Sequence, residues 1–217
     1  GAWKSPAKAR DLLSFLKFLR GADWDMVIDC QGLARSALFS RLTGARVRTG
    51  FQAADEYAWV QYTNRVSVQA THAVDRMMGL LNSPAELQEP DMRLYTPELD
   101  ARWWTLKPHS SNPYVVFAPK SRWGSKEWPE RRWIELAERL SQKISGSVIL
   151  TGSASERAAV DEMARHMKSK GVDSISLAGR TSIGQTMAVI EKASLVVAND
   201  SAPMHMAVGY GRPLGGL

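Results

Sequence analysis

The chain has 217 residues, of which 44% are hydrophobic and 23% are charged, and this composition is ordinary for a soluble globular protein of one or two domains. No apolar run approaches the roughly 20 residues that span a bilayer, no secretory signal is visible at the start, and the one cysteine, Cys30, excludes an internal disulfide framework and fits a reducing compartment. The formal net charge is +6, and residues 106–217 hold most of it, with 15 Lys or Arg against 10 Asp or Glu. This excess favours an anionic small ligand, a nucleic acid or an acidic membrane surface, although no dense basic run with interleaved aromatic residues supports nucleic acid.

The first half of the chain predicts alternating helices and strands. In chain order we expect a capped helix from Ser5-Pro6 to about Gly21, a strand over 24–29, a helix closed at Gly44, a strand over 46–51 and a helix over 71–81. The helix that closes at Gly44 is expected to turn Ala34, Ala37, Leu38 and Leu42 inward. Because the connections are short, this β-α-β order predicts a parallel sheet.

Two stretches of the first half lack a clear period. Between residues 52 and 65, the aromatic residues Tyr57, Trp59 and Tyr62 are expected to pack against the domain rather than bind a ligand. Residues 84–113 contain five prolines, and we expect 105–112 to link two lobes. The predicted domains are therefore 1–105 and 106–217.

The second half predicts a more regular α/β pattern. Strands are expected over 114–118, 147–151, 174–177 and 195–198, and helices over 129–142, 155–168, 183–192 and from 202 onward. This order is typical of a doubly wound domain, in which the loops after successive strands meet at one edge of the sheet and bind the ligand.

The loops after the first two of these strands carry candidate ligand groups. The first loop offers Lys120, Ser121, Arg122 and Lys126, which suit a diphosphate. The alternative is that these residues are solvated surface charges of the loop. Gly152-Ser153 lets the backbone approach a ligand closely. Glu156, placed in the first turn of the next helix, could accept hydrogen bonds from ribose hydroxyls or simply complement the helix dipole.

The stretch 195–205 carries the clearest chemical signal. An apolar strand ends at Asn199-Asp200-Ser201, three residues that favour helix caps, and Ala202-Pro203 can open a helix. The unpaired amides at such a helix start form a site for an anion, best a phosphate. Asp200 would equally serve as a cap, and His205, one turn after Ser201, either faces the same site or packs.

Several enzyme classes lack their motifs in this sequence. We find no GxGxxG fingerprint, Walker A loop, HExxH pair or Cys/His metal spacing, which argues against a dehydrogenase, a kinase, a metalloprotease and a metal site. Asp200 and His205 lack a convincing nucleophile, so a serine hydrolase is not supported.

Four blocks of the sequence together resemble the ADP-heptose:lipopolysaccharide heptosyltransferases, glycosyltransferase family 9. The blocks are 25–33 (DMVIDCQGL) with Arg35-Ser36-Ala37, similar to DLVIDLQGL.KSA; 72–76 (HAVDR), similar to HAVER; 125–129 (SKEWP) with Arg132-Trp133, similar to KRWP..RW; and 199–207 (NDSAPMHMA), similar to NDTGPMHLA. The last block is the most diagnostic. The resemblance implies a GT-B fold of two Rossmann-like lobes, with the sugar nucleotide on the C-terminal lobe and the acceptor on the N-terminal lobe.

The resemblance also implies roles for particular residues. The donor-binding residues would be Ser121 and Lys126 at the diphosphate, Glu156 at the ribose, Thr181 at the adenine, the amides of Ser201 and Ala202 at phosphate oxygens, and Asp200 and His205 near the sugar. The acceptor-side residues would be Gln31, Gly32 and Arg35, where Arg35 replaces the usual lysine and changes the geometry of the charge.

The sequence departs from the family pattern at both ends. It starts after the family's first strand and its Ser-x-x-Gly-Asp loop, whose acidic residue is the favoured general base, so no catalytic base is assigned. It ends at 213–217, before the family's closing helices. We therefore expect an incomplete N-terminal lobe and a truncated C-terminal lobe.

The favoured function is that of an inverting glycosyltransferase that moves a heptose-type sugar from ADP-heptose to a lipid-linked lipopolysaccharide core acceptor, without a cofactor. The expected location is cytoplasmic, with peripheral contact to the inner face of the membrane. The alternative is a non-catalytic module that binds a nucleotide or phosphosugar, and nucleic-acid binding is disfavoured.

Overall fold

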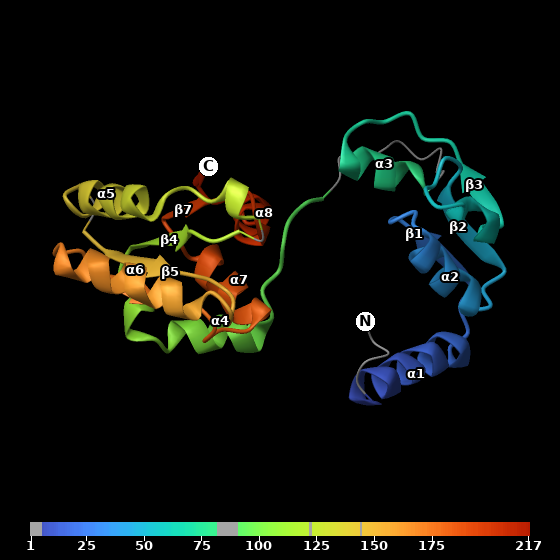
Figure 1. The fold of residues 1–217 in the computed structure, drawn as a ribbon, viewed down its shortest axis with the longest axis horizontal. Coiled ribbons are helices and arrows are strands. Elements are labelled where there is room, and N and C mark those ends of the chain that lie inside the picture. The colour runs from blue at the N-terminus through green and yellow to red at the C-terminus, as the bar shows by residue number, and fades with distance from the viewer. Residues whose placement is uncertain (1–5, 82–90, 122, 144) are drawn as a thin grey trace. The chain divides into compact units, whose positions relative to one another are not determined.

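The computed structural model describes residues 6–81, 91–121, 123–143 and 145–217, and the chain forms two compact units, residues 1–91 and 92–217. Each unit has its own parallel β-sheet with helices packed on it (Figure 1). The α/β class and the two-lobe organisation predicted from the sequence are therefore confirmed.

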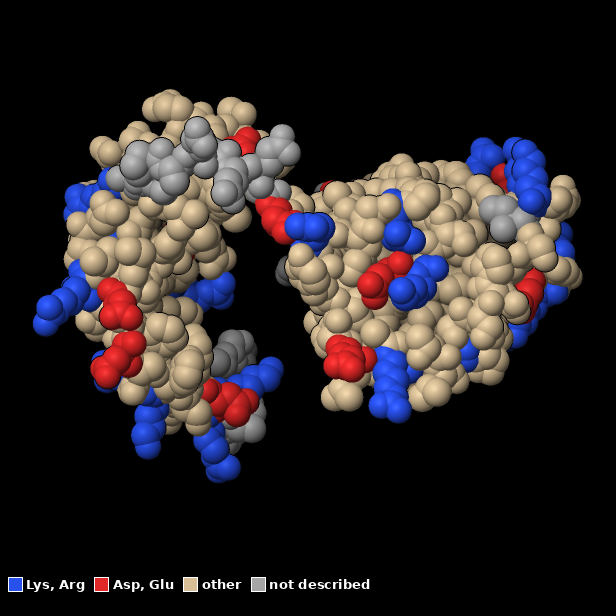
Figure 2. Space-filling model, turned by 180° about the vertical axis from the view of Figure 1, so that it is seen from behind, with Lys and Arg blue, Asp and Glu red and all other residues tan. Residues whose placement is uncertain are grey.

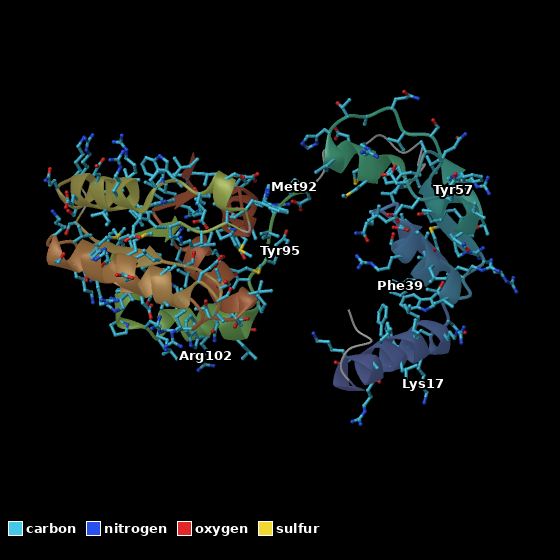
Figure 3. The ribbon with its side chains drawn as sticks, in the orientation of Figure 1. Lys17, Phe39, Tyr57, Met92, Tyr95 and Arg102 are labelled. Carbon is cyan, nitrogen blue, oxygen red and sulfur yellow. The ribbon has the colours of Figure 1, made fainter. Side chains whose placement is uncertain are left out.

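The N-terminal unit contains a three-stranded parallel sheet in the order β1-β2-β3. Its elements are α1 (Pro6–Gly21), β1 (Met26–Asp29), α2 (Ala34–Leu42), β2 (Val47–Phe51), η2 (Ala58–Gln61), β3 (Asn64–Val66) and α3 (Ala73–Gly79). All the helices and strands predicted for this half are present, and β3 and the 3-10 helix η2 are additional. Phe39 on α2 points toward α1 (Figure 3), where it meets the ring of Phe15 with 5.2 Å between ring centres.

Three predicted contacts of this unit are wrong, because Ala34, Leu38 and Tyr57 are all exposed. Leu38 was expected to face inward, but it is exposed, because Ala37 occupies the inner face of α2 and the next residue of a helix is turned by about 100°. Tyr57 was expected to pack, but its side chain is 78% exposed and points outward (Figure 3). Tyr62 and Trp59 do pack, together with Ala37 and Ala58.

Tyr62 fixes the turn that follows β1. Its hydroxyl donates to Oδ2 of Asp29 at 2.7 Å, while Oδ1 of Asp29 accepts from the amides of Gln31 at 2.9 Å and Gly32 at 3.1 Å. The ring lies so close to Gly50 that it leaves no room for a Cβ at this position. The sequence segment Gln31-Gly32 is thus held by a buried carboxylate rather than by its own turn preference alone.

We expect Tyr62→Phe to lower the free energy of unfolding by about 1 kcal/mol, the typical contribution of one hydrogen bond. Burial, then the hydrogen bond to Asp29 and its negative charge, raise the pKa of Tyr62 well above its ordinary value of 10.0. The unfolded chain would lose this proton first, so wild-type stability is complete below pH 10 and falls as the pH rises further. Urea unfolding at about pH 8 and about pH 10.5 tests both effects, because the variant should lose less stability at the higher pH. An equal loss in both proteins would contradict the assignment.

The C-terminal unit contains a five-stranded parallel sheet in the order β6-β5-β4-β7-β8. Its elements are α4 (Glu98–Thr105), η3 (Pro108–Ser110), β4 (Tyr114–Ala118), η4 (Gly124–Lys126), α5 (Glu130–Ser141), β5 (Ser147–Leu150), α6 (Arg157–Ser169), β6 (Ser174–Ser176), α7 (Ile183–Glu191), β7 (Leu195–Ala198), α8 (Ala202–Gly209) and β8 (Leu214–Gly216). The predicted strands and helices of this half are all present. The edge strand β8 and the helix α4 were not predicted.

Strand β4 lies at the centre of the unit, and all five of its residues are buried. Val115 and Phe117 pack with residues of α5 and α6 on one face of the sheet. Tyr114, Val116 and Ala118 pack with residues of α4, α7 and α8 on the other face. The alternation of side chains along a strand therefore builds the two layers of the core.

The boundary between the units lies earlier than the predicted one at 105/106. Helix α4 packs on α7 and belongs to the C-terminal unit. Nε1 of Trp104 donates to the hydroxyl of Tyr114 at 2.8 Å, which donates to the carbonyl of Val189 at 2.7 Å. The proline-rich stretch 84–113 therefore contains a helix of two turns, α4, which was not predicted. The helix is stabilised by these tertiary contacts rather than by a long apolar period.

Candidate functional site

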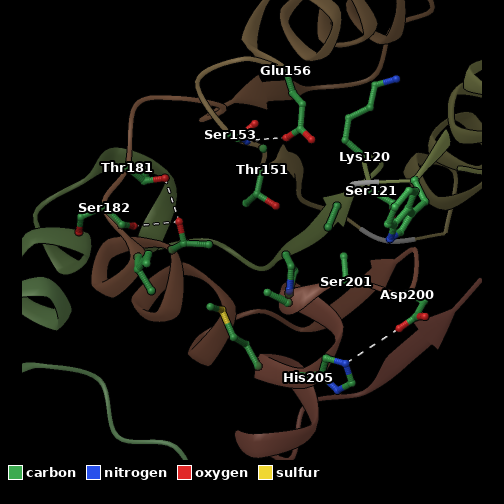
Figure 4. Close-up of a pocket in the computed structure, with 18 residues that line it drawn as sticks. Lys120, Ser121, Thr151, Ser153, Glu156, Thr181, Ser182, Asp200, Ser201 and His205 are labelled. Carbon is green, nitrogen blue, oxygen red and sulfur yellow. Dashed lines mark hydrogen bonds and ion pairs between the residues drawn. The ribbon is translucent and has the colours of Figure 1, made fainter. Parts of the chain in front are cut away.

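The sheet order of the C-terminal unit places a crevice at the carboxyl ends of β4 and β7. The connections from β4 and from β7 lead to opposite sides of the sheet, and such a switch point is where doubly wound domains bind ligands. A cavity of about 710 Å³ lies here (Figure 4). The loops after β4, β5 and β6 and the start of α8 line it.

The structure brings most of the predicted donor residues together around this cavity. Seven of them line it: Ser121, Glu156, Thr181, Asp200, Ser201, Ala202 and His205. The side chain of Lys126 lies outside the described residues, although its backbone is part of η4. Gln31 and Gly32 lie in the turn after β1 of the N-terminal unit, and Arg35 lies in the first turn of α2. The individual roles of these residues remain predictions.

The start of α8 offers backbone amides to the cavity. Ser201 is the N-cap residue with extended backbone angles, but its side chain makes no capping bond and its hydroxyl donates to the carbonyl of Asn199 at 3.0 Å. Pro203 stands at the second helical position, where the missing amide costs no hydrogen bond. Within the described part of the chain, no side chain accepts from the amides of Ser201 or Ala202. This is the geometry of an anion site.

Asn199 joins the loop after β4 to the end of β7. Its side chain is fully buried, its Nδ2 donates to the carbonyl of Pro119 at 2.7 Å, and its Oδ1 accepts from the amide of Trp128 at 3.2 Å. Both ends of the segment 119–128 are therefore tied to one side chain. The sequence predicts that Asn199 is one of three capping residues, whereas in the structure its amide group cross-links two loops.

The loop after β4 contains an internal ion pair. Nζ of Lys120 donates to Oε2 of Glu127 at 2.9 Å, and the amide of Ser121 donates to Oε1 of Glu127 at 3.1 Å. Burial raises the pKa of Glu127, but the hydrogen bonds from Lys120 and Ser121 outweigh it, so the pKa lies below its usual value. Lys120 lines the cavity, but its ammonium group is paired with Glu127 and points away from the cavity (Figure 4), so contact of this residue with a diphosphate stays a prediction.

Glu156 lines the cavity from the loop after β5. Glu156 was predicted to lie in the first turn of this helix. In the structure it is the N-cap of α6, because the helix begins at Arg157. Its Oε2 accepts from the amide of Ser153 at 2.7 Å. This bond leaves the other carboxylate oxygen for a ligand hydroxyl.

The end of the loop after β6 and the start of α7 add Ser182, Ile183 and Thr186 to the cavity lining, and none of these three was singled out as a ligand-binding residue from the sequence. Ser182 caps α7 through a reciprocal pair of bonds with Gln185, and the helix begins at Ile183, as predicted. The hydroxyls of Thr181 and Thr186 lie 2.9 Å apart. This wall is therefore a row of hydroxyl groups beside an exposed apolar side chain.

Arg180 holds the same loop in place. Its guanidinium forms two hydrogen bonds of 2.7 Å to the carboxylate of Asp161 and also donates to the carbonyls of Ser176 and Ala178. These bonds from Arg180 hold the pKa of Asp161 well below its usual range. The loop that carries Thr181 is thus positioned by a paired charge outside the cavity.

The remaining charged pair of the cavity is Asp200 and His205. Nε2 of His205 lies 4.0 Å from Oδ1 of Asp200, and both side chains are well exposed (Figure 4).

Among the described residues, no group of three or more His, Cys, Asp or Glu could hold a metal ion. On the face shown in Figure 2, Lys and Arg are scattered between Asp and Glu over a largely uncharged surface. None of the described helices is both long and apolar enough to cross a membrane.

Comparisons with known proteins place the chain in a family. A family model described as glycosyltransferase family 9 (heptosyltransferase) matches residues 12–217. The chain is 28% identical to lipopolysaccharide heptosyltransferase 3 of Escherichia coli K12 and 30% identical to lipopolysaccharide heptosyltransferase 1 of Pseudomonas aeruginosa, with 95% and 92% of this chain covered. It spans 62% and 55% of the length of these two relatives.

A solved structure gives the same result. The E. coli heptosyltransferase WaaC with ADP-2-deoxy-2-fluoro heptose superimposes with a TM-score of 0.76 and 25% sequence identity, over 99% of this chain and 67% of that one. This likeness agrees with the GT-B class that the sequence motifs imply. Since the family model covers nearly the whole sequence, and the motif 199–207 lies at the switch-point cavity, the chain belongs to glycosyltransferase family 9, the heptosyltransferases.

Proposed function

We propose that the C-terminal unit binds the donor of an inverting glycosyltransferase, which transfers a heptose-type sugar from ADP-heptose to a lipopolysaccharide core acceptor. The observation that carries this proposal is the convergence of seven residues, which the family resemblance assigns to the donor, on one cavity at the switch point; four of them belong to the motif 199–207. The relative with a bound ADP-sugar analogue supports the choice of nucleotide.

The geometry suits the departure of a nucleoside diphosphate. The acceptor hydroxyl attacks the anomeric carbon as the bond to the diphosphate oxygen breaks, so negative charge grows on the diphosphate. The amides of Ser201 and Ala202 at the positive end of α8, with Lys126 contributed from η4, would stabilise that charge. Glu156 and Thr181 are then assigned to the ribose and the adenine.

The N-terminal unit is assigned to the acceptor. Asp29 and Tyr62 fix the Gln31-Gly32 turn, and Arg35 follows in the first turn of α2. A rigid turn followed by a cation suits an acidic, lipid-linked oligosaccharide. We place the protein in the cytoplasm, with peripheral contact to the inner face of the membrane where this acceptor is held.

Calorimetric titration of the 217-residue chain with ADP, and with ADP-heptose, tests the donor site. We expect both to bind, and Lys126→Ala to weaken ADP binding about tenfold through loss of one charge-assisted hydrogen bond. Lys168→Ala on the exposed surface of α6 is the matched control and should leave the affinity within about twofold. A chain that binds neither ligand would refute the proposed donor site.

A non-catalytic module that binds a nucleotide or phosphosugar is the second candidate. The cavity suits this function as well as it suits catalysis, because all seven of its predicted residues are assigned to binding the donor. The binding module predicts the same ADP titration but no glycosylated product, so a product assay of the full-length protein with ADP-heptose and a lipid-linked acceptor separates the two.

A further inference from the structure

The segment 119–128 carries a charged pair that the proposed function does not use. The side chains of Lys120 and Glu127 are 24% and 25% exposed, and their charged atoms lie 2.9 Å apart. Lys120 lines the cavity, whereas Glu127 lines a neighbouring cavity of about 460 Å³ together with Trp128 and Asp200. The ion pair therefore joins a residue of the proposed donor cavity to a residue of the neighbouring cavity.

Glu127 is held in place independently of Lys120. Its Oε1 accepts from the amide of Ser121, and the next residue, Trp128, is fixed by Asn199 and by its ring contact with the buried Trp133, 5.7 Å between centres. A carboxylate anchored in this way can restrain a flexible lysine, because the lysine must give up a charge-assisted hydrogen bond in order to turn elsewhere.

We propose that Glu127 is a positioning residue that withholds the ammonium group of Lys120 from the diphosphate, and so limits how tightly this site binds a nucleoside diphosphate. The inference rests on the proposed donor function. Its consequence is chemical: the transferase must release ADP after each transfer, and a second lysine on the diphosphate would strengthen product binding as well as donor binding.

Removal of the acidic charge should free Lys120. Glu127→Gln keeps the volume and an oxygen that accepts from Ser121, but it loses the ion pair. We expect it to bind ADP about five- to tenfold more tightly than wild type, the contribution of one added charged hydrogen bond. Lys120→Met alone should change the affinity by no more than about twofold, and Lys120→Met with Glu127→Gln should return it to near the wild-type value.

The double variant separates this mechanism from a simple effect of charge. If loss of a negative charge alone strengthens ADP binding, the gain would persist without Lys120, and the proposal would be wrong. Glu135→Gln is the matched control, because this exposed residue on α5 pairs with Arg132 at 3.0 Å and should not alter ADP binding. Weaker binding by Glu127→Gln would also overturn the proposal, since Glu127 would then shape the site in favour of the ligand.

The measurement is calorimetric titration of the 217-residue chain and its variants with ADP, with folding checked by far-UV circular dichroism. Glu127→Ser is a second uncharged variant for the case in which Glu127→Gln does not fold. A wild-type chain that fails to bind ADP refutes the donor function and this inference together. A wild-type chain that binds ADP, with affinity unchanged in Glu127→Gln, refutes only the role of Glu127.

Discussion

Ser201→Asp is expected to reduce ADP affinity by about 100-fold or more, because it places a carboxylate where the phosphate would bind. A like charge within about 4 Å costs several kcal/mol at the effective dielectric of a protein surface. Asp is also among the best N-cap residues, and Ser201 already has the extended backbone of an N-cap, so α8 should remain folded. Calorimetric titration with ADP measures the loss.

Ser201→Asn is the matched control for this change. Asn has the shape of Asp and caps helices equally well, but it carries no charge. We expect it to keep ADP affinity within about fivefold of wild type. Equal affinities of the Asp and Asn variants would show that the start of α8 does not hold the diphosphate, whatever else binds in the cavity.

Asn199→Ala is expected to lower the free energy of unfolding of the C-terminal unit by roughly 2–4 kcal/mol. The change removes the partners of the Pro119 carbonyl and the Trp128 amide, and each buried polar group left unpaired costs about 1–3 kcal/mol. Because both ends of 119–128 would be released, ADP binding should also weaken at least tenfold. Urea unfolding followed by tryptophan fluorescence measures the stability, since five of the eight tryptophans lie in this unit.

Asn112→Ala provides a control for Asn199→Ala, because Asn112 is exposed before β4 and its loss should cost less than about 0.5 kcal/mol. Asn199→Asp should fall between the two, since Asp can accept from Trp128 but cannot donate to Pro119. If Asn199→Ala unfolds like wild type yet loses ADP, Asn199 contacts the ligand rather than the loops.

The elements of the C-terminal unit were predictable because its strands are short, apolar and buried. Runs such as Tyr114–Ala118 carry their own signal. Helix α4 was not predicted because it is short and is stabilised by Trp104, which packs in the core with residues of α7. The edge strand β8 was missed because Leu214-Gly215-Gly216 has little strand preference, and it forms by pairing with β7.

The candidate site was predictable to a similar extent. Residues at a strand end or a helix start, such as Ser121 and Ser201, follow from the rule that loops after parallel strands meet at one edge. The hydroxyl wall of Ser182 and Thr186 was missed because these residues carry no charge or motif, and they reach the cavity through the position of α7.

The sequence by itself determined the class of this protein, since periodicity and the four motifs are local properties of the chain. Which polar side chains are engaged by other parts of the protein was decided only by the tertiary structure. In the sequence, Lys120 is one of several basic residues of its loop, and Asn199 looks like a cap. Lys120 is paired with Glu127 and Asn199 joins two loops, because hydrogen bonds between segments distant in sequence are fixed by packing that no local pattern contains.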